Sequence, residues 1–225
     1  RAAPLTCLFF SDCHLRPGGV PGPGMSSLEI PETCGAMLLP DCTLFPHGGL
    51  PLRIFEPRYR RMLEDSLAGS CFFAVARLLG EETEDPADCV SPVGTIGLVR
   101  ASREMDDGTS NLLLHGVIRV RFVEWLEGTD YPTARIRPIA QIFEPASQAG
   151  AALDALRDAA DRATAGLPGE VKDAFDSMAS GIDDPAILAD VLSQQFIRDP
   201  DDRHDLLSME SVAERVAWLC SRLDP

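Results

Sequence analysis

Lysine is almost absent from this sequence. Of its 20 basic residues only Lys172 is a lysine, and it lies in the polar stretch Glu-Val-Lys-Asp-Ala. A P-loop places a lysine ammonium on the nucleotide phosphates within a Gly-Lys-Ser/Thr sequence, so this sequence contains no Walker-type nucleotide site. A Ser–Lys dyad or a Schiff-base enzyme would have to use the same lysine, which has no apolar flank to lower its pKa. We interpret Lys172 as a solvated helix residue.

Long apolar runs and paired cysteine motifs are also missing. The best apolar candidate, Cys71–Leu79, is far shorter than the ~20 residues that a membrane-spanning helix needs, and it contains Arg77. The seven cysteines are scattered, without a Cys-x-x-Cys pair or a Cys/His cluster at zinc spacing. We therefore predict a soluble protein with reduced thiols in the cytoplasm, and we expect neither a metal nor a cofactor.

Positive charge is scarce as well. The formal net charge is -15 at pH 7 and the pI is near 4.6. Nucleic acids and anionic membranes both attract proteins through Lys and Arg, so we expect neither partner. An RNA-binding module would need a continuous arginine face on the strands. The arginines that could form basic patches, and that we interpret as solvated, are Arg58, Arg60 and Arg61, and Arg119, Arg121, Arg135 and Arg137.

Catalytic motifs do not stand out either. The histidines are His14, His47, His115 and His204, and no Gly-x-Ser-x-Gly or His-x-x-x-His motif accompanies them. A Cys–His nucleophile would pair Cys42 with His47, or Cys71 with His115. No glycine turn or helix start is placed to activate either thiol. A small hydrolase or thiol enzyme that uses His47 or His115 stays open as an alternative function.

The most distinctive stretch that is present runs from Leu38 to Leu67. The apolar runs Met37–Leu39, Leu44-Phe45 and Leu50–Phe55 are broken by prolines and glycines. An amphipathic segment then begins at Glu56-Pro57, because a proline at the first helical position gives up no hydrogen bond inside the helix. The stretch predicts a strand, a kinked loop, a strand and a helix. The helical face consists of Tyr59, Met62, Leu63 and Leu67.

Strands separated by short turns follow. Asp-Gly within Met105–Thr109 predicts a hairpin turn, and the interrupted alternation at Val117 predicts a bulge near Gly116. Gly80–Cys89 predicts an exposed acidic loop. With one early helix, six or seven strands predict a mixed β-barrel or folded sheet. The later strand candidates are Cys71–Leu79, Val93–Ala101, Asn111–Trp125 and Thr133–Phe143.

From Ala146 onward the sequence has a helical period. Asp184-Pro185 places a cap residue and a proline where a helix begins, and Ser208 is predicted to cap the last helix after a break at Asp199–Asp202. We predict an α+β protein that ends in a small helical bundle. Its parts are a flexible leader outside the fold (1–35, of which 1–24 is an upstream extension), a β-rich part (36–145) and a helical part (146–225).

The opening stretch resembles the amino-terminal LON substrate-binding domain in the string Leu-Leu-Pro-Asp-x-x-Leu-Phe-Pro-x-Gly-x-Leu-Pro-Leu-Arg-Ile-Phe-Glu-Pro-Arg-Tyr. Val93–Gly97, Leu112–Arg119 and Asp205–Arg215 fit the resemblance in the same order, over about residues 36–222. The resemblance implies a PUA-like β-rich part followed by helices, used to recognise substrates or partners. It implies no catalysis, because the ATPase and Ser–Lys protease domains of full Lon proteases are absent from this sequence.

We therefore expect a non-catalytic LON-domain protein that recognises unfolded polypeptide or a protein partner, as an adaptor in protein quality control. The alternatives are the thiol enzyme above and an RNA-binding PUA-like module. Phe45, Leu50 and Phe55 are expected as exposed apolar residues, with core packing as the other interpretation. The candidate partner-binding residues are Phe45, His47, Leu50, Arg53, Phe55 and Arg58.

Overall fold

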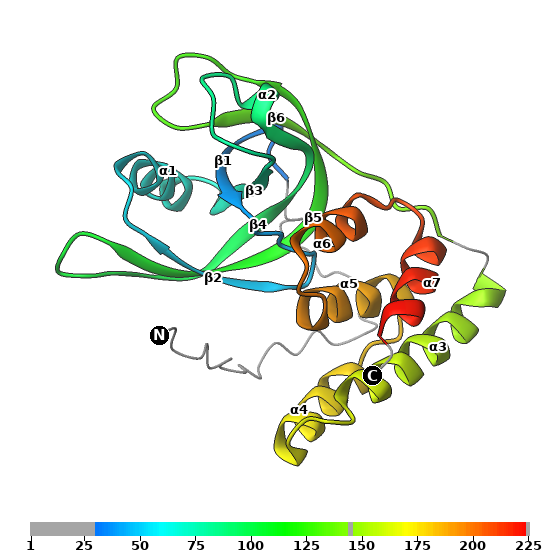
Figure 1. Ribbon diagram of the computed structural model, residues 1–225. Helices are drawn as coiled ribbons and strands as arrows, with labels where there is room; N and C mark the ends of the chain where they lie inside the picture. The colour runs from blue at the N-terminus through cyan, green and yellow to red at the C-terminus, as the bar shows by residue number, and fades with distance from the viewer. Residues whose placement is uncertain (1–29, 144–145, 224–225) are drawn as a thin grey trace, which may run out of the picture. The chain divides into compact units, whose positions relative to one another are not determined.

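The computed structural model describes residues 30–143 and 146–223, and within these ranges six strands and seven helices are formed (Figure 1). No helix in these ranges is long and apolar enough to cross a bilayer. The strands are β1 (Thr33–Pro40), β2 (Gly49–Ile54), β3 (Phe72–Leu78), β4 (Val90–Glu104), β5 (Ser110–Trp125) and β6 (Thr133–Pro138). The helices are α1 (Pro57–Ala68), α2 (Pro86–Cys89), α3 (Ala146–Thr164), α4 (Gly169–Ser180), α5 (Pro185–Phe196), α6 (Pro200–Ser208) and α7 (Val212–Arg222).

The strands form one mixed sheet with the order β2-β5-β4-β3-β1-β6. β1 and β3 run parallel, and the chain reaches β3 through β2 and α1 because parallel neighbours cannot be joined by a tight turn. β6 pairs with β1 and also with the second half of β5, so the sheet folds back on itself. This arrangement confirms the predicted α+β class with a folded mixed sheet and a helical second half.

Two local features of the β4–β5 hairpin are as predicted. Gly108 has φ +74° at the turn, and its amide donates to the Met105 carbonyl at 2.9 Å. Ile96 pairs with Ile118 and Gly97 with Gly116, so Val117 is the extra residue of a bulge. A Cβ on Gly116 would lie 2.1 Å from the Phe45 carbonyl oxygen, so the preceding loop can pack on β5 here only because residue 116 is glycine.

Aspartate or serine side chains cap the start of four helices, which are α2, α5, α6 and α7. Asp184 accepts from the Ala186 amide at 2.8 Å at the start of α5, as predicted. The predicted break at Asp199–Asp202 is instead the start of α6, where Asp199 is the cap. The prediction that Ser208 caps the last helix is wrong. Ser208 ends α6, and Ser211 caps α7 through the Glu214 amide at 3.2 Å.

Several predicted boundaries shift. Residues 1–29, most of the predicted leader, lie outside the described residues, and β1 already begins at Thr33 rather than after residue 35. The predicted acidic loop contains the short helix α2, which ends at the buried Cys89. The last strand ends at Pro138 instead of Phe143. Pro31–Pro225 form one compact unit, and the division of that unit near residue 145 stays a prediction.

Two of the apolar clusters formed by the described residues position the site. In the first, Tyr59 and Met62 of α1 pack against Phe73 and Leu114 of the sheet. The second is made by the helices, with Leu156, Leu192 and Leu219 fully buried at its centre. Phe45 and Val93 from the β-rich part also belong to the second core, so the sheet and the helices share apolar contacts.

A buried ionic cluster, here called the charged joint, also connects the sheet to the helices. It consists of Arg119 of β5, Asp190 of α5 and Arg215 of α7, which are 2%, 1% and 0% exposed. Arg119 donates to both Asp190 carboxylate oxygens at 2.7 and 2.6 Å, and Arg215 Nη1 donates to Asp190 Oδ1 at 2.7 Å. The interpretation of Arg119 as a solvated strand arginine is therefore wrong, because it binds the carboxylate of a helix packed over β5.

Candidate functional site

The loop that leads into β2 is fixed to the helices by its aromatic residue. Phe45 is 0% exposed, and its amide donates to Gln194 Oε1 at 3.1 Å. The Arg203 guanidinium lies 5.2 Å from the centre of the Phe45 ring and donates to the Thr43 carbonyl at 2.7 Å. The expectation of an exposed Phe45 is wrong, because α5 and α6 cover this residue. Phe45 anchors the loop.

Alternate residues of β2 point to opposite sides of the sheet. Leu50 and Leu52 face inward and are half-buried against the first core. On the other side, Gly49, Pro51 and Arg53 are exposed, as is His47 just before the strand. Phe55, which follows the strand, is 64% exposed. Of the predicted site residues, the structure therefore brings His47, Arg53 and Phe55 to solvent along one strand.

The neighbouring strand β5 extends this surface. Gly49 pairs with His115, Pro51 with Leu113 and Arg53 with Asn111, so these β5 side chains lie on the same side of the sheet. A Cβ on Gly49 would be in ordinary contact with Leu113 at 3.5 Å. We call this surface the β2 face and define it as His47, Gly49, Pro51, Arg53, Phe55, Asn111, Leu113 and His115.

Positive charge on the β2 face is carried by Arg53, beside the two histidines His47 and His115. Arg53 reaches the hairpin tip, where its Nη2 is 3.1 Å from Asp107 Oδ2 in an exposed ion pair. The pKa of His115 is lowered chiefly by burial, with Arg100 and His47 lowering it further. Burial is also the main cause of the lowered pKa of His47, which is opposed by the carboxylates of Asp190 and Asp184. Burial therefore favours the neutral imidazole at both positions.

β2 forms the edge of the sheet next to β5 (Figure 1). The Gly116 amide donates to the Gly48 carbonyl at 2.8 Å, and antiparallel pairing alternates from there, so the backbone of Gly49, Pro51 and Arg53 faces outward. Proline has no N–H to offer at the middle of this edge. A partner strand could not form a continuous ladder along β2, which leaves side chains as the means of recognition.

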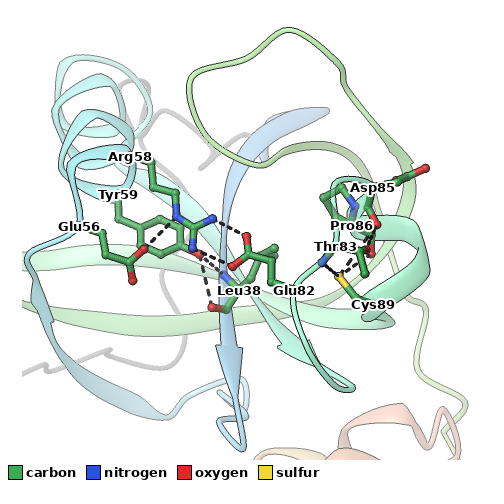
Figure 2. Close-up of polar contacts among 9 residues, drawn as sticks. All are labelled: Leu38, Glu56, Arg58, Tyr59, Glu82, Thr83, Asp85, Pro86 and Cys89. Carbon is green, nitrogen blue, oxygen red and sulfur yellow. Dashed lines mark hydrogen bonds and ion pairs between the residues drawn. The ribbon is translucent and has the colours of Figure 1, made fainter.

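Arg58 lies elsewhere (Figure 2). Its Nε donates to Glu56 Oε2 at 2.9 Å and its Nη2 to Glu82 Oε2 at 2.9 Å, and the guanidinium lies 4.6 Å from the centre of the Tyr59 ring. The hydrogen bonds from Arg58 lower the pKa of Glu82. Arg58 lines a polar pocket of about 560 Å³ together with Trp125. It is therefore separate from the β2 face and already paired with two carboxylates.

The candidate thiol pairs are not assembled. Neither Cys42 nor Cys71 hydrogen-bonds to a histidine within the described residues, and burial raises the pKa of Cys42, which keeps its thiol protonated. A serine–histidine contact that was not predicted joins Ser91 Oγ to His204 Nε2 at 2.9 Å. Ser91 is only 1% exposed, so a substrate cannot reach its hydroxyl.

The arginine face required by the RNA-binding alternative is not formed. Arg119 is buried in the charged joint. Arg121 pairs with Glu210 at 3.2 Å, and Arg135 pairs with Glu124 at 3.3 Å. These carboxylates interrupt the positive surface that phosphate binding would need. In the described ranges no group of three His, Cys, Asp or Glu residues could hold a metal ion.

The profile of the ATP-dependent protease La (LON) substrate-binding domain matches residues 33–224. The chain belongs to this family. It is 24% identical over 202 residues to the Lon protease of Desulfosudis oleivorans, covering 87% of this chain and 24% of that protein. It is 24% identical over 189 residues to the Lon protease of Dictyoglomus thermophilum, with 84% and 24% covered. The chain thus spans about a quarter of the length of the curated relatives it matches.

Two solved structures share the LON-domain fold. The N-terminal domain of Mycobacterium avium complex Lon protease superimposes with a TM-score of 0.66 at 14% identity, covering 85% of this chain and 97% of that one. The Lon N-terminal domain protein from Xanthomonas campestris superimposes with a TM-score of 0.60 at 18% identity, covering 86% and 99%. These matches confirm the resemblance inferred from the sequence.

Sequence reasoning did not identify the β5 half of the β2 face. Asn111 and Leu113 belong to a strand some 60 residues after β2, and their pairing with Arg53 and Pro51 is a long-range contact. Counting forward from the Asp-Gly turn gives their side of β5. It does not give the partner strand. The sequence therefore indicates which side of β5 carries these residues, but not that β2 lies beside them.

Proposed function

We propose that this LON domain recognises unfolded polypeptide or a protein partner through the β2 face, without catalysing a reaction itself. Membership of a substrate-binding domain family supports recognition as the function. In a cell the domain would act as an adaptor in protein quality control. Five free cysteines among the described residues support a reducing, cytoplasm-like compartment.

The observation that carries this proposal is the exposure of Phe55. Its neighbours Ile54 and Tyr59 are each 1% exposed, whereas Phe55 keeps 64% of its surface in solvent. Covering an exposed aromatic side chain contributes about 1.5–3 kcal/mol, so Phe55 can anchor an apolar segment of a partner. Around it, Leu113 adds apolar area, while Arg53 and Asn111 offer hydrogen-bond donors.

Binding to a permanently unfolded, reduced and alkylated protein tests the proposal. We expect Phe55→Ser to weaken binding at least about tenfold in fluorescence anisotropy, because tenfold corresponds to about 1.4 kcal/mol of lost apolar contact. The matched control is Val123→Ser, which removes a 49% exposed side chain farther along β5, outside the β2 face. Equal weakening by both substitutions, or by neither, would contradict a role for this surface.

A further inference from the structure

A second apolar surface is formed by the helical part of the chain, among α3, the start of α5 and α7. Figure 1 shows these three helices next to one another. It is a cleft of about 780 Å³, within the size range of pockets that hold drug-sized ligands. It shares no residue with the β2 face. The cleft is lined by Phe143, Gln148, Ala149, Ala151, Ala152, Asp183, Asp184, Pro185, Val212, Ala213 and Val216.

The backbone next to the aromatic residue of this cleft is anchored to α7. The Ile142 amide donates to the Glu210 carbonyl at 2.9 Å, and the Val212 amide donates to the Ile142 carbonyl at 3.0 Å. These bonds fix the segment that carries Phe143 to the start of α7. Phe143 is nevertheless 58% exposed, as is Ile142. The backbone next to Phe143 is therefore anchored, while its ring is exposed beside an apolar cleft where a partner can cover it.

Short side chains give the cleft its depth. Ala149 and Ala152 from α3 face Ala213 from α7, and Val212 and Val216 are buried behind them. Longer residues at these positions would fill the space between the two helices. The cleft can therefore accept a large apolar side chain, such as leucine or tryptophan, from another polypeptide.

The polar side of the cleft is acidic. Asp183 and Asp184 line it, and none of its described lining residues is Lys, Arg or His. Asp184 is engaged in capping α5. Asp183 is exposed, and it forms no hydrogen bond or ion pair with any described residue. In a chain of formal net charge -15, this placement is complementary to a basic side chain and repels acidic ones.

We propose that this cleft binds a polypeptide segment in which a large apolar side chain lies next to Lys or Arg. The apolar side chain enters between α3 and α7 beside Phe143, and the basic group pairs with Asp183. The inference deepens the proposed function by naming a class of polypeptide. It concerns a different surface, so it stands or fails separately from the β2 face.

Two short fluorescent peptides that differ only in charge test the inference. One carries a tryptophan flanked by arginines, and the other carries the same tryptophan flanked by glutamates. We expect the basic peptide to bind at least about tenfold more tightly in anisotropy titrations at low salt, with the difference shrinking when salt screens the charges. Equal affinities for the two peptides would overturn the charge assignment.

Substitutions then locate the site. We expect Phe143→Ser to weaken binding of the basic peptide about tenfold. Asp183→Lys should also weaken binding of the basic peptide about tenfold, but it should leave the binding of a third peptide, with the same tryptophan and uncharged flanks, nearly unaffected. Ala213→Phe should block binding of the basic and the uncharged peptide by filling the cleft. If that variant does not fold, Phe143→Ser and Asp183→Lys, which change exposed residues, still test the site. Phe55→Ser is the reference variant, because it alters the β2 face only.

The outcomes separate the two proposals. If Phe143→Ser weakens binding of the basic peptide and Phe55→Ser does not, the result supports the cleft even if the β2 face has no role. The reverse pattern overturns the cleft proposal. Self-association of the protein in sedimentation that disappears in Phe143→Ser would also overturn it, because the occupant would then be a second copy of this chain.

Discussion

The charged joint and the β2 face use the same residue types in opposite ways. In the joint, Arg119 is 2% exposed and donates to Asp190 and to the Leu207 carbonyl, so its guanidinium is paired on several sides. On the β2 face, Arg53 is exposed and has one exposed carboxylate partner, Asp107. The two phenylalanines within the LON-like string Leu38–Tyr59 differ likewise, since Phe45 is 0% and Phe55 64% exposed.

This difference separates residues that hold the domain together from residues that are available to a partner. A buried ion pair is stable only when each charge finds its partners, so the joint fixes the position of the helices against β5. An exposed ion pair contributes little to stability. The side chains of the β2 face can therefore exchange their contacts for those of a partner with little effect on the fold.

Removing the carboxylate of the charged joint gives the largest expected effect. Asp190→Ala leaves Arg119 and Arg215 buried beside each other without their shared anion, and we expect the free energy of unfolding to fall by about 3–5 kcal/mol. The matched substitution on the β2 face, Arg53→Ala, removes the exposed ion pair with Asp107 and should change it by less than about 1 kcal/mol. Urea denaturation of both variants makes the measurement. Similar losses in the two would contradict the comparison.

The two aromatics give the next largest contrast. Phe45→Ala opens a cavity in the shared core, and we expect it to lower the free energy of unfolding by about 3 kcal/mol or more. Phe55→Ala removes a side chain that is mostly in solvent, so its stability should stay within about 0.5 kcal/mol of the wild type. Denaturation midpoints report both values. If Phe55→Ala proved as destabilising as Phe45→Ala, Phe55 would be a structural residue.

The sequence predicted the local features of this fold better than its long-range contacts. The Asp-Gly turn, the bulge at Val117 and the Asp184 cap depend on residues within a few positions of each other, and all three are confirmed. The charged joint depends on the pairing of Arg119 with Asp190, 71 residues away. An arginine in an alternating strand looks solvated unless the helix that covers it is known. Its burial could not be inferred from the pattern.

The candidate site was predictable in part for the same reason. Arg53 and Phe55 were predicted together with Leu50, and the structure exposes the first two but turns Leu50 inward, where it is half-buried. Alternation along β2 accounts for this difference. Phe45 precedes the strand in a loop, where no alternation of apolar and polar residues indicates whether its side chain is buried or exposed. Whether it is exposed depends on Gln194 and Arg203, which lie some 150 residues later in the chain. Its role as a core anchor therefore required the three-dimensional contacts.

Two glycines, Gly116 below the anchoring loop and Gly49 on the β2 face, differ in how closely other atoms pack against them. A Cβ on Gly116 would lie 2.1 Å from the Phe45 carbonyl oxygen, so we expect Gly116→Ala to push the anchoring loop off β5 at a cost of about 2 kcal/mol. On the β2 face, a Cβ on Gly49 meets only Leu113 at 3.5 Å, and Gly49→Ala should be nearly neutral. Thermal unfolding distinguishes the two. Equal melting temperatures would contradict the close approach of the loop to β5.

The smallest expected effect is a dependence of the free energy of unfolding on pH, which we assign to His204 of α6. His204 Nε2 contacts Ser91 Oγ, its Nδ1 is buried without a hydrogen-bond partner among the described residues, and burial lowers its pKa. The unfolded chain therefore binds the proton more readily than the folded one. The stability due to neutral His204 is complete above the unfolded pKa of about 6.5 and is lost as the pH falls below it. We expect the free energy of unfolding to decrease from pH 7.5 to 5.5.

The substitution His204→Gln tests this assignment, because glutamine does not titrate and can still hydrogen-bond to Ser91. Its decrease in stability over the same pH range should be shallower than that of the wild type, with His47 and His115, whose pKa values are also lowered, supplying the remainder. His47→Asn is the matched change on the β2 face, since asparagine tolerates the φ of +62° at that position. Its effect on the slope should be smaller, because the carboxylates of Asp190 and Asp184 oppose the effect of burial on the pKa of His47, whereas Nδ1 of His204 is buried without a hydrogen-bond partner among the described residues. A larger effect of His47→Asn than of His204→Gln would place the pH-sensitive contact on the surface and not between the sheet and α6.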